Sequence, residues 1–206
     1  MLINAQQHLA HADSVLAKLI QKYGNCKLCP RLAYDVLCDA IISQQLSLKA
    51  AITISSRFKA LFKDRKLTPS QTLCISDEQL RMIGLSRAKI DYLKNLARNF
   101  KHISDISFQE MTDEEIIYQL TLFKGIGVWT AQMFLIFSLN RLDVLPTCDL
   151  SLRKAILKQY KLNNLPSRVD IERIAQKWRP YRTIAVWYLW RSIDNFPSEA
   201  TEYALS

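Results

Sequence analysis

Apolar residues recur at helical intervals along the whole chain, and this spacing constrains the fold more than any other feature. Ala51, Ile54 and Phe58 show it in one segment, and Leu93 and Leu96 repeat it in another. A spacing of three or four residues places side chains on one face of an α-helix, whereas a half-buried strand needs an alternation of two. We find no convincing alternation of two, so we predict an all-α protein. The expected helices cover approximately residues 3–23, 33–44, 47–63, 77–82, 86–101, 113–122, 128–139, 149–160, 168–178 and 181–193.

Capping signals and prolines agree with this division. Ser76 and Thr112 each begin a capping-box pattern, in which a Ser or Thr is followed three residues later by Gln or Glu. The prolines that fall between the expected helices mark joints, because proline ends or starts helices: Pro30, Pro69, Pro146, Pro166 and Pro180. No linker, low-complexity run or tandem repeat separates autonomous domains, so we expect a single unit over residues 1–206, which can still consist of two lobes.

The charge balance favours a polyanionic partner. Lys and Arg number 28 against 19 Asp and Glu, a formal net charge of +9, although a basic protein without such a partner remains an alternative. No segment approaches the roughly 18 to 20 apolar residues of a membrane span, and the N-terminus lacks a cationic start and a cleavage signal. We therefore expect no membrane partner and a cytoplasmic location.

The cysteines do not suggest a disulfide framework. There are five of them, an odd number at irregular spacing, so reduced thiols are expected. Cys26 and Cys29 form a C-x-x-C pair downstream of His8 and His11, and these four side chains could make a tetrahedral zinc site, although apolar packing is the favoured interpretation. An iron–sulfur cluster would need four closely spaced cysteines, and no such set occurs.

The stretch FKGIG places two of the four glycines of the chain, Gly125 and Gly127, between two expected helices. The backbone must reverse there within about four or five residues, and glycine permits the positive φ angles that such a turn needs. Without side chains, the turn and the N-terminus of the next helix could also bind a phosphate. An ordinary tight turn between helices remains the alternative, since a lone G-x-G is a weak signal. Trp129, Met133 and Phe137 then share one helix face, a stripe that by itself is more often core than binding site.

Four stretches together resemble a known family. LFKGIGVWTAQMFLIF followed by LDVLPTCDLSLRKA, together with AIISQQLSLKAA, IGLSRAKIDYLKNLA and KWRPYRTIAVWYLWR, is similar to the helix-hairpin-helix DNA glycosylases, and most of all to the 3-methyladenine DNA glycosylase II branch in its compact form. The resemblance implies a two-lobed fold with the active site in the cleft between the lobes. Lobe A would comprise about 1–40 plus 146–206, and lobe B about 41–145 with the hairpin 113–139.

The resemblance implies that Asp149 is the catalytic carboxylate. Cleavage of an N-glycosidic bond builds positive charge on the deoxyribose, so a fixed anion beside the sugar is needed. Asp149 ends the loop LPTCD and opens the next helix, whose dipole and free amides favour an ionised carboxylate. A plain helix cap is the alternative role, and the two roles are compatible.

The hairpin helix bears on the mechanism and the substrate. Relatives that also cut the strand carry a lysine nucleophile there, whereas this chain has Trp129, which cannot form a Schiff base and implies a monofunctional enzyme that uses water. By resemblance, Trp129, Met133 and Trp190 form the base pocket, and electron-rich indoles suit cationic alkylated purines. Met133 stands where some relatives have tyrosine, which leaves the range of bases open. Trp178, Tyr181 and Trp187 are better explained as packing residues.

Damaged double-stranded DNA is the partner that the resemblance implies for a monomeric enzyme. The residues expected to contact it are those of the hairpin, Lys124, Gly125, Ile126, Gly127 and Thr130, with Gln45 filling the gap left by a flipped base and Gln44 beside it. No cofactor is expected, except that the main-chain carbonyls of Thr121, Phe123 and Ile126 would hold a monovalent cation. Two rival interpretations remain open: a non-catalytic helix-hairpin-helix module that binds DNA, and a glycosylase of this fold that acts on another lesion.

Overall fold

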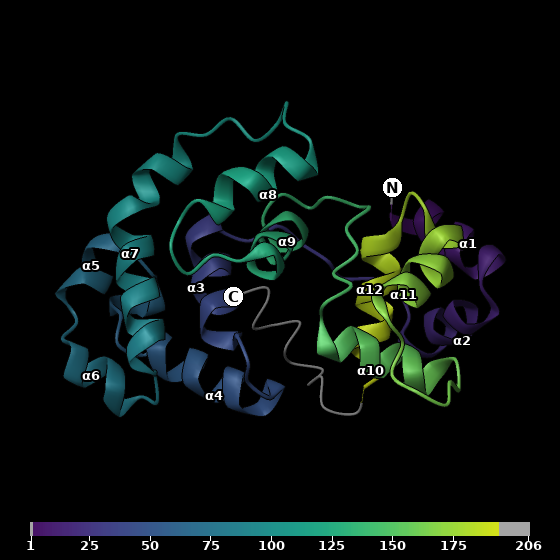
Figure 1. Cartoon of the computed structure of the whole chain (residues 1–206), viewed down its shortest axis with the longest axis horizontal. Coiled ribbons are helices and arrows are strands. Elements are labelled where there is room, and N and C mark those ends of the chain that lie inside the picture. Colours follow the sequence, from purple (N-terminus) through teal and green to yellow (C-terminus); the bar gives the residue numbers. More distant parts are fainter. Residues whose placement is uncertain (1, 194–206) are drawn as a thin grey trace. The chain divides into compact units, whose positions relative to one another are not determined.

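The computed structural model describes residues 2–193, and this part of the chain contains twelve α-helices, two short 3-10 helices and no strand (Figure 1). The prediction of an all-α protein is confirmed. The helices are α1 (Leu2–Ala12), α2 (Ser14–Tyr23), α3 (Ala33–Ser43), α4 (Leu48–Lys59), η1 (Lys63–Arg65), α5 (Pro69–Cys74), α6 (Asp77–Met82), α7 (Arg87–Ser104), α8 (Asp113–Thr121), α9 (Val128–Phe137), α10 (Leu150–Gln159), α11 (Arg168–Ala175), η2 (Gln176–Trp178) and α12 (Arg182–Arg191).

Two elements differ from the sequence prediction. The helix expected over 3–23 is broken at Asp13, which has an extended backbone and caps α2 by accepting a hydrogen bond from the N–H of Val15 at 2.9 Å. The second difference is α5, which was not expected because Pro69 was interpreted as a joint. Pro69 instead occupies the first turn of α5, where proline is well tolerated, and Thr68 caps that turn.

The chain forms two compact units. One unit combines the N-terminal segment up to Pro30 with the segment that starts at Leu135, and the other is Arg31–Phe134. The lobes expected from the sequence change at about 40/41 and 145/146, which is about ten residues later in the chain than the two boundaries between these units. The catalytic carboxylate expected at Asp149 belongs to the first unit and the hairpin to the second.

The first unit is built around α12. Every residue from Thr183 to Trp190 is buried, and the helix packs against α1, α2 and α10. A helix that is apolar on all sides is stable only inside a core, which explains this central position. Trp178 from η2 is also fully buried, as its interpretation as a packing residue requires.

The second unit is built around α3 and α7 (Figure 1). Helix α3 packs against α4 and α7, and α7 also contacts α5 and α6. Helix α8 and the first part of α9, as far as Phe134, complete this unit. The ring of Phe134 makes an edge-to-face contact with that of Phe108, with the ring centroids 5.1 Å apart. The hairpin therefore rests on a scaffold of longer helices.

Neither a membrane span nor a metal cluster is present among residues 2–193. No helix there has both the length and the apolar composition needed to cross a bilayer. No three His, Cys, Asp or Glu side chains of this region lie together in a way that could hold a metal ion. Of the proposed zinc ligands, Cys26 is buried, Cys29 is exposed, and the His8 ring packs against that of Tyr181.

Candidate functional site

Gly125 is required by the fold of the hairpin. Its φ of 97° lies in a region that side-chain-bearing residues rarely adopt. A Cβ at this position would also lie 2.5 Å from Cβ and Cγ of Tyr92, which projects from α7. Both the backbone angle and the packing therefore demand glycine here, as the sequence predicted for the turn.

Gly127 is not required by the fold in this way. Its φ is outside the left-handed region, and a Cβ there would meet no heavy atom within 4 Å among the described residues beyond its chain neighbours. The residue is exposed and its carbonyl accepts the first hydrogen bond of α9, from Ala131. The first N–H groups of a helix have no acceptor inside that helix. The result is an exposed, side-chain-free surface at the positive end of a helix, which suits an anion.

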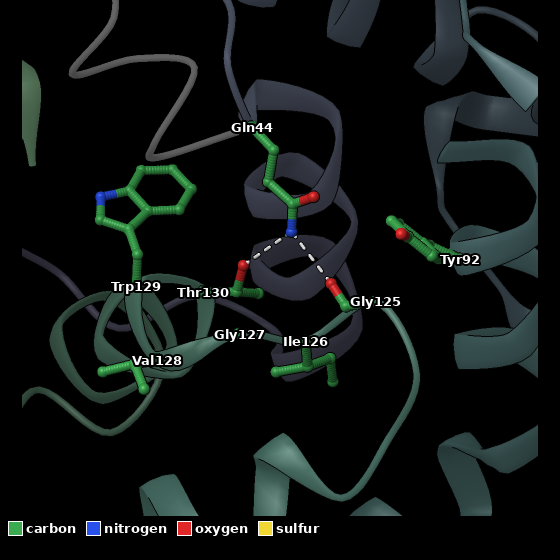
Figure 2. Close-up of a pocket in the computed structure, with 8 residues that line it drawn as sticks. All are labelled: Gln44, Tyr92, Gly125, Ile126, Gly127, Val128, Trp129 and Thr130. Atoms are coloured by element: carbon green, nitrogen blue, oxygen red, sulfur yellow. Dashed lines mark hydrogen bonds between the residues drawn. The ribbon is translucent and has the colours of Figure 1, made fainter. Parts of the chain in front are cut away.

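Gln44 ties the end of α3 to the hairpin. Its Nε2 donates to the carbonyl of Gly125 at 2.9 Å and contacts the hydroxyl of Thr130 at 3.0 Å. Figure 2 shows this amide between Thr130 and Gly125, with the Trp129 indole on one side and the Tyr92 ring on the other. The sequence predicted that Gln44 contacts DNA. In the structure its side-chain amide instead binds Gly125 and Thr130 of the hairpin.

Gln45, the residue expected to fill the gap in the duplex, is exposed and has a φ of 55°. This left-handed conformation is uncommon for a residue with a side chain and costs about 1 kcal/mol or more. It occurs in a tight turn, in which the N–H of Leu46 donates to the carbonyl of Ser43 at 3.2 Å. The turn carries the Gln45 side chain on the outside of the unit.

An open pocket of about 410 Å³ lies beside the hairpin. The residues that line it come from the C-cap of α3, from α7 and from the hairpin: Gln44, Tyr92, Gly125, Ile126, Gly127, Val128, Trp129 and Thr130. Trp129 is half-buried, and Val128 next to it is 55% exposed. Met133, one turn further along α9, is buried and does not line this pocket.

The hairpin carbonyls are partly engaged. The carbonyl of Phe123 accepts from the N–H of Ile126 at 3.1 Å, and that of Lys124 accepts from Nδ2 of Asn95 at 3.0 Å. A carbonyl oxygen has two lone pairs, so the bond at Phe123 is compatible with cation binding. The cation site expected at Thr121, Phe123 and Ile126 stays a prediction.

In the other unit, Asp149 is the N-cap of α10 and is 9% exposed. Its Oδ1 accepts from the N–H of Leu152 at 2.6 Å and from the indole N–H of Trp190 at 3.0 Å. The preceding loop is folded tightly, because the N–H of Asp149 donates to the carbonyl of Pro146 at 2.9 Å. Two fixed donors at the N-terminus of a helix hold this carboxylate in one orientation.

Trp190 contacts the carboxylate of Asp149. It was predicted to line the base pocket, and the structure shows a buried side chain that donates to Asp149 and stacks on Phe137 with ring centroids 6.0 Å apart. Whether its face also touches a base stays a prediction. Of the remaining aromatic residues, Trp187 is buried against Tyr188, which agrees with a packing role.

Helix α12 also holds the start of the loop that leads to Asp149. The Thr183 hydroxyl donates to the carbonyl of Arg141 at 2.7 Å and accepts from the N–H of Val144 at 2.9 Å. Arg182 forms an ion pair with Asp143 at 2.7 Å. The loop is thus anchored to a buried helix at its beginning and, through Trp190, at its end.

Three residues of α7 that sequence reasoning missed support the hairpin and the turn at Gln45. Lys89 binds main-chain carbonyls at the end of α3, Tyr92 packs against Gly125, and Asn95 binds the carbonyl of Lys124. They are spaced by three residues, which places them on one side of the helix. Polar and aromatic residues at this spacing on a helix of otherwise apolar periodicity are the signal that could have identified them.

Comparisons with known proteins assign the family. A model of the HhH-GPD superfamily of base excision DNA repair proteins matches residues 38–180. DNA-3-methyladenine glycosylase 1 of Schizosaccharomyces pombe is 36% identical over 201 residues, which cover 93% of this chain and 87% of the relative. The structure of S. pombe 3-methyladenine DNA glycosylase (Mag1) in complex with abasic DNA matches with a TM-score of 0.81 at 36% identity and covers 91% of this chain and 95% of that chain.

A third match agrees with these. The crystal structure of a DNA-3-methyladenine glycosidase from Bacillus halodurans is 34% identical and has a TM-score of 0.68, covering 96% of this chain and 90% of that chain. The family model spans most of the chain, and the solved structures match its helices. The chain therefore belongs to the HhH-GPD superfamily of base excision DNA repair proteins.

Proposed function

We infer that the protein is a DNA-3-methyladenine glycosylase of base-excision repair, and we propose that it is monofunctional, flipping alkylated purines out of damaged duplex DNA and leaving an abasic site. The observation that carries the proposal is Asp149, a nearly buried carboxylate whose Oδ1 is fixed by a backbone N–H and by the indole of Trp190. The relative named DNA-3-methyladenine glycosylase 1, 36% identical over 93% of this chain, supports the substrate class.

In this proposal Asp149 stabilises the positive charge that develops on the deoxyribose as the glycosidic bond breaks. A preorganised charge aimed at a developing charge of opposite sign lowers the barrier without reorganisation during the reaction. The bonding electrons leave with the purine, water adds its oxygen to C1′, and the surplus proton passes to solvent. A purine alkylated at N3 or N7 leaves as a neutral base, so no general acid is required.

Trp129 determines the type of product in this proposal. An amine nucleophile at the start of the hairpin helix would form a Schiff base and lead on to strand cleavage, and an indole cannot do so. The half-buried indole can instead stack on a flipped cationic purine, an arrangement that cation–π attraction favours. Met133, one turn further along α9, is buried, and its contact with the flipped base stays part of the proposal.

The hairpin supplies the hold on the backbone of the DNA. Gly127 and the first amides of α9 present a surface that a phosphate can approach closely, and the net charge of +9 favours a polyanion. Lys124 and Thr130 lie on the same hairpin, where the Lys124 side chain adds charge and Thr130 is fixed by Gln44. A monovalent cation on the carbonyls of Thr121, Phe123 and Ile126 would orient these amides further.

The test is base release from methylated duplex DNA by the wild-type protein and by Asp149→Asn. Asparagine caps helices as well as aspartate does, so α10 should keep its N-cap while the negative charge is removed. We expect release of methylated purines by wild type and a loss of at least about a hundredfold in the variant, with binding to an abasic-analogue duplex retained. Strands should break only after alkali treatment, because a monofunctional enzyme leaves the backbone intact.

Asp170→Asn provides the matched control. It makes the same chemical change in the first turn of α11, in the same unit, at a half-exposed carboxylate that belongs to the capping box of that helix. Equal losses in the two variants would assign the effect of Asp149→Asn to a general change of charge. A wild-type protein that binds the duplex but releases no methylated base would contradict the proposed function and leave a DNA-binding module.

A further inference from the structure

Lys89 binds the backbone at the end of α3. Its Nζ donates to the carbonyls of Ile42 and Gln44, each at 2.7 Å. The last carbonyls of a helix have no partner inside it, and a lysine ammonium satisfies them and complements the helix dipole. No carboxylate among residues 2–193 forms an ion pair with Lys89, and burial lowers the pKa of its ammonium. This lysine therefore serves two main-chain oxygens and not a charged partner.

Both carbonyls precede Gln45: that of Ile42 lies just before the turn, and that of Gln44 lies inside it. Gln45 follows Gln44 directly and has the strained φ of 55°. Strained conformations persist only where the surroundings over-determine them, and they occur often at functional sites. Lys89 fixes the main chain just before Gln45, because its ammonium binds the carbonyl oxygen of Gln44.

The same turn is connected to the hairpin through Gln44. The main-chain carbonyl of Gln44 accepts from Lys89, and the side-chain amide of Gln44 donates to the carbonyl of Gly125 (Figure 2). The two contacts act on opposite ends of one residue. All of these groups belong to the Arg31–Phe134 unit, so α7, the turn and the phosphate-binding hairpin form one continuous hydrogen-bonded assembly.

We propose that Lys89 is a positioning residue for base flipping, which fixes the Ile42–Gln44 carbonyls so that Gln45 is presented rigidly to the duplex. The proposal rests on the proposed function and on the prediction from the sequence that Gln45 fills the gap left by the flipped base. Extruding a base is costly, and the side chain that replaces it compensates only if it is already in place. Without Lys89, the turn would have to be ordered anew in each flipping event.

The variant to test is Lys89→Met, which keeps an unbranched apolar side chain of similar length and removes the ammonium donors. Ordering one or two backbone residues per event predicts a loss of roughly ten- to a hundredfold in the flipping equilibrium. A duplex with 2-aminopurine beside the lesion reports flipping by fluorescence, and single-turnover release of 7-methylguanine reports the consequence for the reaction. Binding to an abasic-analogue duplex should change less, because that duplex has no base to extrude.

A double-mutant cycle with Gln45→Ala separates positioning from general stability. If Lys89 acts through Gln45, adding Lys89→Met to Gln45→Ala should cause little further loss of flipping. Additive losses would overturn the proposal. Circular dichroism of every variant at the assay temperature establishes that the compared proteins are folded.

A salt titration separates positioning from direct phosphate binding. A lysine that binds phosphate lowers the salt slope of DNA binding by about one when it is removed. We expect an unchanged slope for Lys89→Met, and a slope reduced by about one would overturn the proposal. Lys101→Met, at an exposed position on the same helix, is the matched control, and an equal loss of flipping in this control would also overturn it.

Wild-type behaviour distinguishes this inference from the function on which it rests. If wild type neither flips nor releases a methylated base, the proposed function and the inference both fail. If wild type does both and Lys89→Met does so equally well, the inference alone fails.

Discussion

Gly127→Ala tests whether the hairpin binds phosphate, because neither packing nor the backbone conformation requires glycine at this position. A Cβ there would contact no heavy atom within 4 Å among the described residues, and the backbone needs no positive φ. Alanine restricts the unfolded chain more than glycine does, which stabilises the folded protein by about 0.4–1 kcal/mol. Alanine is also a poorer helix N-cap than glycine, which destabilises the folded protein by a similar amount. The two effects oppose each other, so the free energy of unfolding should change by less than about 1 kcal/mol.

DNA binding should respond much more strongly to the same methyl group. It would stand where a phosphate must approach the first amides of α9, and the loss of one hydrogen bond to a charged group is worth about 1.5–3 kcal/mol. The affinity for duplex DNA should therefore fall by about ten- to a hundredfold. Fluorescence anisotropy with labelled duplex measures the affinity, and urea unfolding measures the stability.

Gly125→Ala is the internal comparison for this prediction. The added Cβ would force a left-handed alanine, at about 1–3 kcal/mol, and would also collide with Tyr92 at 2.5 Å. This variant should lose stability as well as binding. Unchanged DNA affinity in a folded Gly127→Ala protein would refute the assignment of this surface to phosphate.

Two further predictions concern the other unit. Trp190→Phe removes the indole N–H that donates to Asp149 while keeping an aromatic ring. In single-turnover and steady-state kinetics, kcat for base release should fall about tenfold with little change in KM. A change confined to KM would instead favour a role in the base pocket. Asp13 is buried, and although burial alone would raise its pKa, hydrogen bonds from Tyr160 and Trp178 lower the pKa below the usual value of 3.8. Because the folded-state pKa is lowered, the ionised carboxylate stabilises the fold above pH 3.8, and this stabilisation is lost as the pH falls through the folded-state pKa. Asp13→Asn removes the charge that these donors bind, so it should cost roughly 1.5–3 kcal/mol at neutral pH and less below pH 3.8. Urea unfolding of both proteins across that range measures this, and a cost independent of pH would contradict it.

The sequence was sufficient to predict local features of the site. The hairpin turn follows from Gly125, whose need for a positive φ is a property of the residue type, and the cap of α10 follows from an Asp placed before an apolar helix. The fold class follows from periodicity, which needs only neighbours in the chain. These predictions hold because each depends on a few consecutive residues.

The contacts that support the site could not be predicted in this way. Lys89 reaches carbonyls 45 and 47 residues away, and Trp190 reaches Asp149 across 41 residues. A side chain that binds a distant main-chain oxygen leaves no periodic signal, because every residue type except proline offers the same carbonyl and N–H. The break at Asp13 was missed for a related reason: neither glycine nor proline marks it, and the cap depends on local hydrogen bonds.

The strength of each functional argument depends on what the fold already explains. Gly125 is fully explained by the turn and by Tyr92, so its presence says little about DNA, whereas Gly127 is not explained by packing and points to an external ligand. Asp149 is explained by capping α10, so its position alone does not establish catalysis. Asparagine would cap equally well, and therefore Asp149→Asn separates the two roles: a stable, DNA-binding, inactive variant would mean that the charge, and not the cap, is what the reaction requires.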